Sequence, residues 1–281
     1  MKLRYDPLQI FRSSKTPAGL YARQKWLDDA SPRWQADFQE TVGALWAGQG
    51  PDGSWHRSAP ATIMHLFGLH LTVRSASPKI ETALSWLLAQ IDLQPQALRV
   101  HWDEPIGSSE LTGLPFTPSR SDMFLTGATL FLSTIFGRQE DPAVLGLYRW
   151  LCRQAAASRG FWLDAAASHN IFRALVVHPE FAQDAATTRM AERLSELQTE
   201  KGDWGPELPF YQTLNALAHL QLPQVEGQLE MAFGRLRKTQ NSDGTWGRHE
   251  AEWNTFLAVH ALRNKGLMQD CRNAADPLIL N

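Results

Sequence analysis

The sequence has little cysteine, almost no net charge and no hydrophobic run of membrane-spanning length. Its two cysteines, Cys152 and Cys271, have no CxxC partner, which argues against a disulfide framework and against a cysteine-rich metal site. The 27 basic and 29 acidic residues nearly cancel to a net charge of -2. Such a balance leaves no electrostatic footprint for nucleic acid, so we expect no nucleic-acid partner.

The most apolar stretches, at 62–73 and 125–136, are too short to cross a bilayer. The N-terminal segment is charged throughout and lacks an apolar stretch of signal-peptide length. We therefore expect no membrane span and a cytoplasmic location. The 281 residues, with 43% hydrophobic and 20% charged side chains, are typical of one soluble globular domain, which we assign to residues 1–281.

Tryptophan is abundant, with 11 copies, and several of them follow a repeated pattern. A helix-like run ends in Gln, a turn rich in Gly and Asp follows, and a Trp stands 6 residues after the Gln. The clear copies are Gln49 with Trp55, Gln198 with Trp204, and Gln240 with Trp246, and looser copies join Gln90 with Trp102 and Gln154 with Trp162. The last three of these Trp, at 162, 204 and 246, are each 42 residues apart, a period typical of stacked helical pairs.

The pattern has a physical interpretation at each helix end. A Leu or Trp lies four residues before each Gln, one helical turn away and on the same face. The Gln stands at a helix C-terminus, where backbone carbonyls lack partners, and its amide can bond to those groups or to the next turn. The Trp ring would cover the helix end. We therefore predict that each copy acts as a staple between adjacent repeats.

The rest of the chain divides into helices on either side of these turns. Outer helices are predicted over 33–49, 79–91, 142–156, 183–199 and 226–240. Inner helices are predicted over 60–73, 121–136, 168–178, 209–220 and 251–264. A first helix near 17–28 and a last near 267–278 would bring the number to about six pairs. No stretch alternates with the period of a strand, so the fold class is all-α.

Two segments do not follow the repeat. Residues 92–120 contain four prolines and no helical periodicity, which predicts an inserted loop, either a surface insertion or a lid. Residues 1–16 interleave basic and apolar side chains. We interpret them as an N-terminal strap packed on the helices, and the alternative is a basic rim for a diphosphate or a protein partner.

The Gln-to-Trp turns resemble the QW motifs of terpenoid cyclases, the squalene–hopene cyclase group, and the repeats of protein prenyltransferase β subunits. The resemblance covers residues 45–267 and implies an α6/α6 toroid, an α/α barrel of about six helical hairpins whose inner helices line a cavity. Class II cyclases of this kind carry a DxDD acid motif at the start of an inner helix. The equivalent segments here are 60–62, 122–124, 169–171, 211–213 and 253–255, and none of them is DxDD.

The residues that stand in these segments are the candidate site residues. Asp122 is the carboxylate at an inner-helix start, and His169 begins the next inner helix, so the two could form a catalytic acid–base unit. The alternative is that Asp122 is a helix N-cap and His169 a hydrogen-bonded histidine at the cavity edge. Six further residues are candidates for substrate contact or, equally, for core packing: Phe124, Asn170, Tyr211, Gln212, Trp253 and Asn254.

No motif for a metal or another cofactor is present, and we expect neither. The zinc-ligand set of protein prenyltransferases is missing, and Asp28-Asp29 does not continue into an Asp-Asp-x-x-Asp motif. His249, Glu250 and Glu252 do not match His-Glu-x-x-His, and we assign them to a solvated loop. The spacing of the inner-helix histidines does not converge on one metal site; they are His65, His70, His219 and His260.

Two functions follow from these patterns. The first is a terpenoid cyclase-like protein that acts on or binds an isoprenoid or other apolar substrate in the toroid cavity, an isomerase or lyase if it is catalytic. The second is a non-catalytic binding or scaffold protein on the same fold, for which a protein partner is possible. Fold alone does not decide between them.

Overall fold

The computed structural model describes residues 1–91, 113–117, 123–158, 160 and 165–268. Within these ranges it contains eleven α-helices and no β-strand, which confirms the all-α class. None of these helices combines the length and the apolar character that crossing a membrane requires. The helices are α1 (Pro17–Trp26), α2 (Pro32–Trp46), α3 (Ala59–Thr72), α4 (Pro78–Ala89), α5 (Met123–Ile135), α6 (Pro142–Ala157), α7 (Ala165–Leu175), α8 (Ala185–Leu197), α9 (Phe210–Leu217), α10 (Pro223–Thr239) and α11 (Ala251–Asn264).

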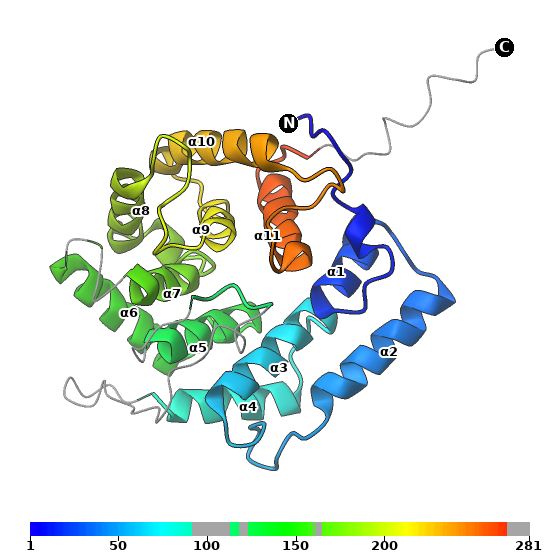
Figure 1. Cartoon of the computed structure of the whole chain (residues 1–281). Helices are drawn as coiled ribbons and strands as arrows, with labels where there is room; N and C mark the ends of the chain where they lie inside the picture. The colour runs from blue at the N-terminus through cyan, green and yellow to red at the C-terminus, as the bar shows by residue number, and fades with distance from the viewer. Residues whose placement is uncertain (92–112, 118–122, 159, 161–164, 269–281) are drawn as a thin grey trace.

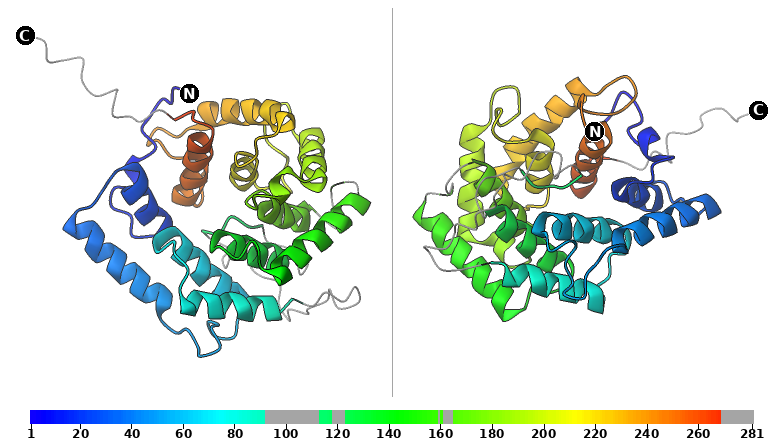
Figure 2. Two further views of the ribbon diagram at one scale, coloured as in Figure 1. Left: turned by 180° about the vertical axis from the view of Figure 1, so that it is seen from behind. Right: turned by 60° about the horizontal axis from the view of Figure 1, so that its bottom comes forward.

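The helices form two layers around a common centre (Figure 1). The odd-numbered helices lie inside, and each contacts the next, from α1 through α3, α5, α7 and α9 to α11, which in turn contacts α1. The even-numbered helices lie outside them, and the two views of Figure 2 show the same order around the ring. The six inner helices therefore make a closed circuit of contacts.

Local signals in the sequence set where several of these helices begin. The side chains of Ser31, Ser77 and Asp141 each accept a hydrogen bond from a backbone N–H in the first turn, at the starts of α2, α4 and α6. A proline follows each of them directly, where its missing N–H costs nothing and its fixed φ suits a helix. The outer helices begin where these Ser-Pro and Asp-Pro pairs predict.

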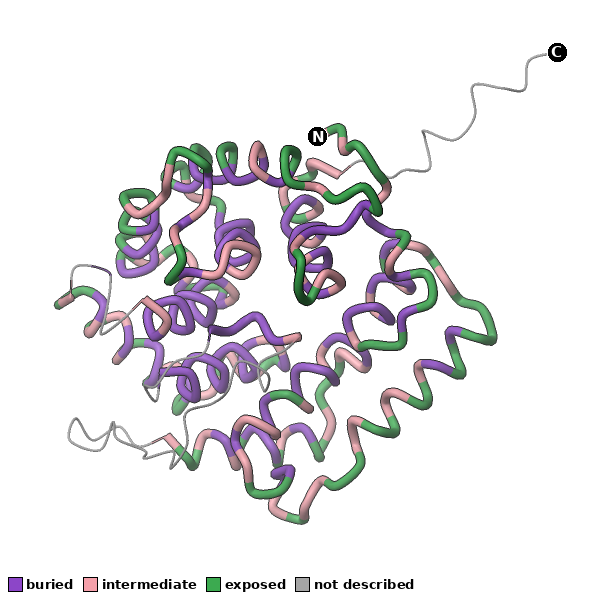
Figure 3. The backbone as a smooth tube through the Cα atoms, viewed as in Figure 1, coloured by how far each residue is buried: buried purple, intermediate pink, exposed green. Residues whose placement is uncertain are grey.

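Burial separates the two layers (Figure 3). Every residue of α5 from Met123 to Thr134 is buried, as expected for a helix surrounded by protein. The outer α2 buries only Trp34 and Asp37 and exposes the rest of its surface to a greater or lesser degree. The core of the protein therefore lies on and between the inner helices.

The tryptophans of the three clear Gln-to-Trp turns are buried as predicted. Trp55 and Trp246 are 0% exposed and Trp204 is 3% exposed. The indole N–H of Trp246 donates to the carbonyl of Leu236 in the last turns of α10 (2.8 Å), and that of Trp55 donates to the carbonyl of Ala47 just after α2 (3.0 Å). The Trp side chains thus cover helix ends and bond to carbonyls there.

The glutamines connect each turn to the next outer helix. Gln49 Nε2 donates to the carbonyl of Lys79 at the start of α4 (3.0 Å), and Gln198 Nε2 donates to the carbonyl of Gln228 in α10 (2.9 Å). Both also donate to a glycine carbonyl within their own turn. Gln198 caps α8, as expected, whereas α2 ends at Trp46, so Gln49 lies in the turn beyond it.

In the described residues no outer helix follows the last turn, and the N-terminal segment takes that place. Gln240 Nε2 donates to the carbonyl of Tyr5 (3.0 Å), and Gln240 Oε1 accepts from the backbone N–H groups of Arg4 (3.1 Å) and Tyr5 (3.2 Å). Gly244 packs directly on the backbone of Asp6. The beginning of the chain is therefore bonded to its last repeat, and the outer layer is closed there.

Two predicted segments are only partly covered by the described residues. Of the predicted helix at 267–278, residues 267 and 268 are not helical, and the rest lies outside the described residues. Of the predicted loop at 92–120, residues 113–117 are described. Leu114 and Phe116 are each 2% exposed, so a surface insertion is the wrong description of these five residues.

The packing of Trp246 predicts a large loss of stability on truncation. Trp246→Ala should lower the free energy of unfolding by about 3–5 kcal/mol, because it removes a fully buried ring and its bond to Leu236. Urea denaturation followed by circular dichroism measures the change. An unchanged midpoint would contradict the role of this Trp as a staple.

Gly244 and Gly234 form a matched pair for the closure of the ring. Gly244 has φ +88°, and a Cβ there would lie 2.2 Å from the carbonyl oxygen of Asp6, whereas a Cβ on Gly234 in α10 would meet nothing within 4 Å. Gly244→Ala should therefore destabilise the protein by more than about 1 kcal/mol. Gly234→Ala should stabilise it by roughly 0.5–1 kcal/mol through helix propensity. Equal effects in thermal unfolding would contradict the close packing of Gly244 on the strap.

Candidate functional site

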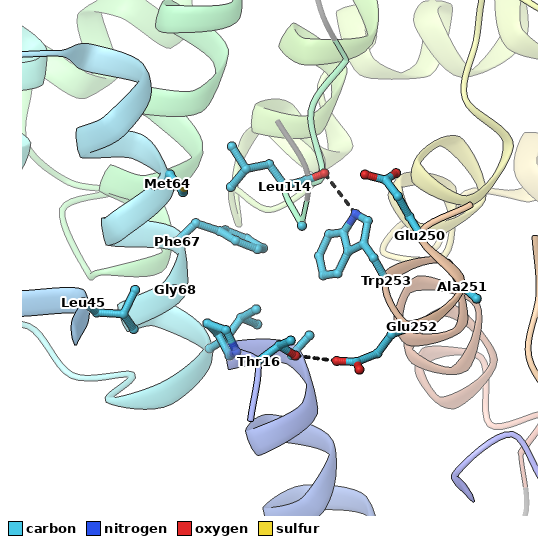
Figure 4. A pocket seen from close by; sticks show the side chains of 14 residues that line it. Thr16, Leu45, Met64, Phe67, Gly68, Leu114, Glu250, Ala251, Glu252 and Trp253 are labelled. Carbon is cyan, nitrogen blue, oxygen red and sulfur yellow. Dashed lines mark hydrogen bonds between the residues drawn. The ribbon is translucent and has the colours of Figure 1, made fainter. Parts of the chain in front are cut away.

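A mainly apolar pocket of about 490 Å³ lies between the first turns of α1 and α11 and one face of α3 (Figure 4). We call it the apolar pocket. Its walls combine aliphatic and aromatic side chains with a few backbone-rich positions. They are formed by Thr16, Pro17, Ala18, Leu45, Met64, Phe67, Gly68, Leu71, Gly113, Leu114, Glu250, Ala251, Glu252 and Trp253.

Hydrogen bonds between two helix starts hold one side of this pocket. Glu252, in the first turn of α11, accepts hydrogen bonds from the hydroxyls of Ser14 (2.8 Å) and Thr16, the residue that caps α1. The sequence placed Glu252 in a solvated loop, and that assignment was wrong. Glu252 is a helical, half-buried residue that joins the N-terminus of α1 to that of α11.

An aromatic pair divides the apolar pocket from the centre of the ring. The rings of Phe67 and Trp253 meet edge to face at 5.9 Å, and both residues line the cavities on either side. Trp253 Nε1 donates to the carbonyl of Leu114 (3.1 Å), which fixes the indole against the segment 113–117 (Figure 4). Trp253 also stacks on Phe256 at 5.3 Å. The partition is thus held by packing and by one hydrogen bond.

Behind the partition lies a second cavity of about 340 Å³, which we call the central chamber. Side chains from all six inner helices reach it, together with Pro115. Most of them are apolar, but five are polar. The lining is Tyr21, Phe67, His70, Leu71, Pro115, Phe131, Ile135, Arg173, Val176, Val177, Asn215, His219, Trp253, Phe256, Leu257 and His260.

Three polar side chains of the central chamber, Arg173, Asn215 and His260, are linked by hydrogen bonds. Arg173 Nη1 donates to Asn215 Oδ1 (2.9 Å), so the amide nitrogen of Asn215 is the donor to His260 Nδ1 (3.1 Å) and to the carbonyl of Leu257 (3.3 Å). Because Nδ1 of His260 accepts, the proton of its neutral ring is on Nε2. His219 lies beside His260, with ring centroids 5.5 Å apart.

Burial keeps these histidines neutral. Desolvation, with the charge of Arg173 as a further cause, lowers the pKa of His260 to about 4, and desolvation lowers the pKa of His70 to about 4. The same two causes lower the pKa of His219 well below its ordinary value. Burial also lowers the pKa of Arg173, to about 9, so the guanidinium keeps its positive charge at pH 7. The chamber thus holds one cation among neutral groups.

Of the predicted acid–base pair, only His169 lies within the described residues. Asp122 lies outside the described residues. His169 is buried in α7, and its Nδ1 hydrogen bonds to the hydroxyl of Thr117 (2.9 Å). Asn170 clamps the same residue, accepting from the Thr117 N–H and donating to its carbonyl, both at 2.8 Å. Both side chains therefore hold the segment 113–117 in place.

The other predicted contact residues are spread around the ring. Trp253 lines both cavities, as a substrate-contacting residue would. Phe124 packs on Phe116 at 5.9 Å, and Tyr211 packs on Phe210 at 5.1 Å.

The two remaining candidates lie on the helices that follow the last two turns. Gln212 is half-buried in α9, and Asn254 donates to the carbonyl of His249 (2.8 Å) in the turn before α11. Of the predicted contact residues in the described ranges, Trp253 is the one that lines a cavity described above.

The residues that sequence reasoning missed are those of the central chamber. From the sequence, His70, His219 and His260 were considered only as metal ligands, which their spacing disfavours, yet all three line this chamber. A signal for this was present, because Arg173 and Asn215 are 42 residues apart, as are Asn215 and Leu257. This is the spacing of the Trp repeat, so these positions are equivalent on successive inner helices. In the described ranges, no group of three or more His, Cys, Asp or Glu is arranged to hold a metal ion.

Comparisons with known proteins find a solved structure of similar fold but no protein of named function. No known family model matches the sequence, and no curated protein matches it. A solved structure, described as the crystal structure of a protein from Actinoplanes, is similar with a TM-score of 0.53 and 18% sequence identity. The match covers 90% of this chain and 89% of that one. At this identity the similarity concerns the fold alone.

The buried histidines predict a loss of stability in mild acid. The pKa is about 4 for His70 and His260 and about 3 for His169, against an ordinary value of 6.5. Their contribution is fully present above pH 6.5 and is lost as the pH falls toward 4, because the unfolded chain then binds protons that the folded chain excludes. Urea unfolding should show a fall of about 1 kcal/mol or more per pH unit between pH 6 and 5.

Two variants test the origin of this slope. His70→Gln should reduce the slope, since it removes a half-buried, desolvated imidazole. His249→Gln should leave it unchanged, because His249 is exposed in the turn before α11. The same slope in both variants would contradict the assignment to buried histidines.

Proposed function

We propose that this chain is an α/α toroid that binds an apolar, isoprenoid-like small molecule in the apolar pocket. The observation that carries the proposal is the pocket itself, a cavity of about 490 Å³ inside the ring. Its size is typical of small-molecule sites, and its walls include Met64, Phe67, Leu71 and Trp253. Aromatic and flexible apolar side chains of this kind suit an apolar chain.

Two features support the toroid assignment. The inner helices contact one another in a closed circuit, and the outer helices follow them in order. The glutamines of the QW-type turns donate to the backbone of the next outer element, so the repeat in the sequence corresponds to a repeated hydrogen bond. The resemblance to terpenoid cyclases and to prenyltransferase β subunits is therefore carried by these turns.

Binding is favoured over cyclisation by the groups that line the cavities. Alkene protonation requires a neutral carboxylic acid in contact with the substrate. The central chamber has no Asp or Glu among its described lining residues. In the apolar pocket, Glu252 is engaged by the hydroxyls of Ser14 and Thr16, and Glu250 is exposed to solvent, so neither carboxyl group is enclosed with an apolar ligand. Asp122, the predicted donor, lies outside the described residues.

A charge placed in the pocket should abolish the binding of apolar ligands. Met64 lines the pocket and is 42% exposed, so Met64→Glu should fold normally while its carboxylate opposes burial of an apolar chain. We expect the affinity for farnesol or geranylgeraniol, measured by isothermal titration calorimetry, to fall by about tenfold or more. Met231→Glu is the matched control, because Met231 is also 42% exposed and lies on the outer α10.

The same titrations separate the possible outcomes. Equal affinities in the two Met variants would remove the pocket assignment. Cyclic products from a panel of linear isoprenoids, lost in Asp122→Asn, would replace binding by cyclase activity. The cytoplasmic location and a protein partner stay predictions from the sequence.

A further inference from the structure

Among the described residues, Arg173 is a buried cation without an acidic partner. It is 2% exposed, and its Nε has no hydrogen-bond partner within the part of the chain that the structure describes. Among these residues, its hydrogen bond is to the neutral amide of Asn215. The described residues around it in the central chamber include no Asp or Glu. Burying an unpaired charge in this way costs free energy, so it requires an explanation.

A second buried arginine, Arg23, serves as a comparison, because it holds two helices together. Arg23 is 1% exposed and connects α1 to α2, and two carboxylates neutralise it. Its Nε donates to Asp29 (2.9 Å) and its Nη1 to Asp37 (2.8 Å) and to the carbonyl of Ser14 (3.1 Å). The two arginines are equally buried, yet only Arg23 is paired with acids in the described residues. Arg173 therefore differs from an arginine whose role is to hold helices together.

The surroundings of Arg173 hold it in position without neutralising it. Its guanidinium lies over the ring of Phe131, 5.5 Å from the centroid, and Asn215 bonds one terminal nitrogen. Arg173 is in the last turn of α7, where the carbonyl end of the helix favours a cation. These contacts preorganise the guanidinium and leave its Nε edge for another group.

Two further polar groups point to a ligand in the same chamber. His70 Nδ1 is buried and has no hydrogen-bond partner among the described residues. His260 carries its proton on Nε2, since its Nδ1 accepts from Asn215. The chamber thus combines a side-on guanidinium edge, an unpartnered ring nitrogen and an imidazole donor. The guanidinium and His260 Nε2 can donate to an oxygen, and His70 Nδ1 can do so in the tautomer that carries the ring proton there.

We propose that the central chamber binds the carboxylate of an apolar monocarboxylic acid, with Arg173 as its bidentate partner. One fixed positive charge matches one negative charge, whereas a diphosphate would bring additional charge among neutral histidines. The planar guanidinium fits a carboxylate side-on through Nε and a terminal nitrogen. The remaining walls include Phe131, Val176 and Phe256, which would contact the hydrocarbon part. The inference specifies the ligand class within the ring and so extends the proposed function.

The experiment titrates the full chain with three ligands that share one hydrocarbon chain: decanoate, decanol and decyl phosphate. Decanoate should bind at least about tenfold more tightly than decanol, the effect expected of a charge-assisted pair out of water. Arg173→Met should remove this preference. Arg193→Met is the control, because Arg193 is 45% exposed on the outer α8, and it should bind all three ligands like the unchanged protein.

Thermal unfolding separates a binding role from a structural one. If Arg173 serves a ligand, Arg173→Met should keep or raise the melting temperature of the ligand-free protein, because an unpaired buried charge is removed. Decanoate should raise the melting temperature of the unchanged protein and of Arg193→Met, but not that of Arg173→Met. If Arg173→Met does not fold, Arg173→Lys keeps the charge but loses the side-on fork, and it should bind decanoate with intermediate affinity.

Three results would overturn the inference. They are equal affinity for decanoate and decanol, undiminished decanoate binding by Arg173→Met, and tighter binding of decyl phosphate than of decanoate. If farnesol still binds in a Met64-dependent manner in any of these cases, the carboxylate site fails while the proposed function stands. If no apolar ligand binds at all, both fail together.

Discussion

The three clear Gln-to-Trp turns are each joined to the next outer element by the same kind of hydrogen bond, from a glutamine amide to a backbone carbonyl. A helical pair cannot bury its apolar face alone, so the pairs are stable only when they stack. The last of these bonds runs from Gln240 to Tyr5 and joins the end of the repeat array to its beginning. This bond helps to hold the first and last inner helices, α1 and α11, in contact.

Because the ring is closed, polar side chains at its centre are removed from water, so those without partners indicate a function. The inner helices are buried on nearly every side, and a polar group there must be paired or costs stability. Most such groups are satisfied, as Asn170 is by Thr117. Arg173 and His70 retain unpartnered nitrogens in the described structure, and both face one chamber. Selection for stability alone would favour apolar side chains at these positions.

The two cavities meet at the pair of Phe67 and Trp253. This pair is braced by Leu114, from the segment that the sequence predicts to be an inserted loop. Residues His169 and Asn170, chosen from the sequence as site residues, hold the other end of that segment through Thr117. They shape the centre of the ring through packing and hydrogen bonds, while Trp253 faces the cavities directly.

The sequence by itself determined the features that depend on local interactions. Helix starts at Ser31, Ser77 and Asp141 and the buried Trp246 follow from caps, prolines and a short-range repeat. The site was decided by the tertiary structure. Periodicity tells which residues share a helix face, but not which distant faces meet once a ring closes, and so it missed the convergence on Arg173 from six helices.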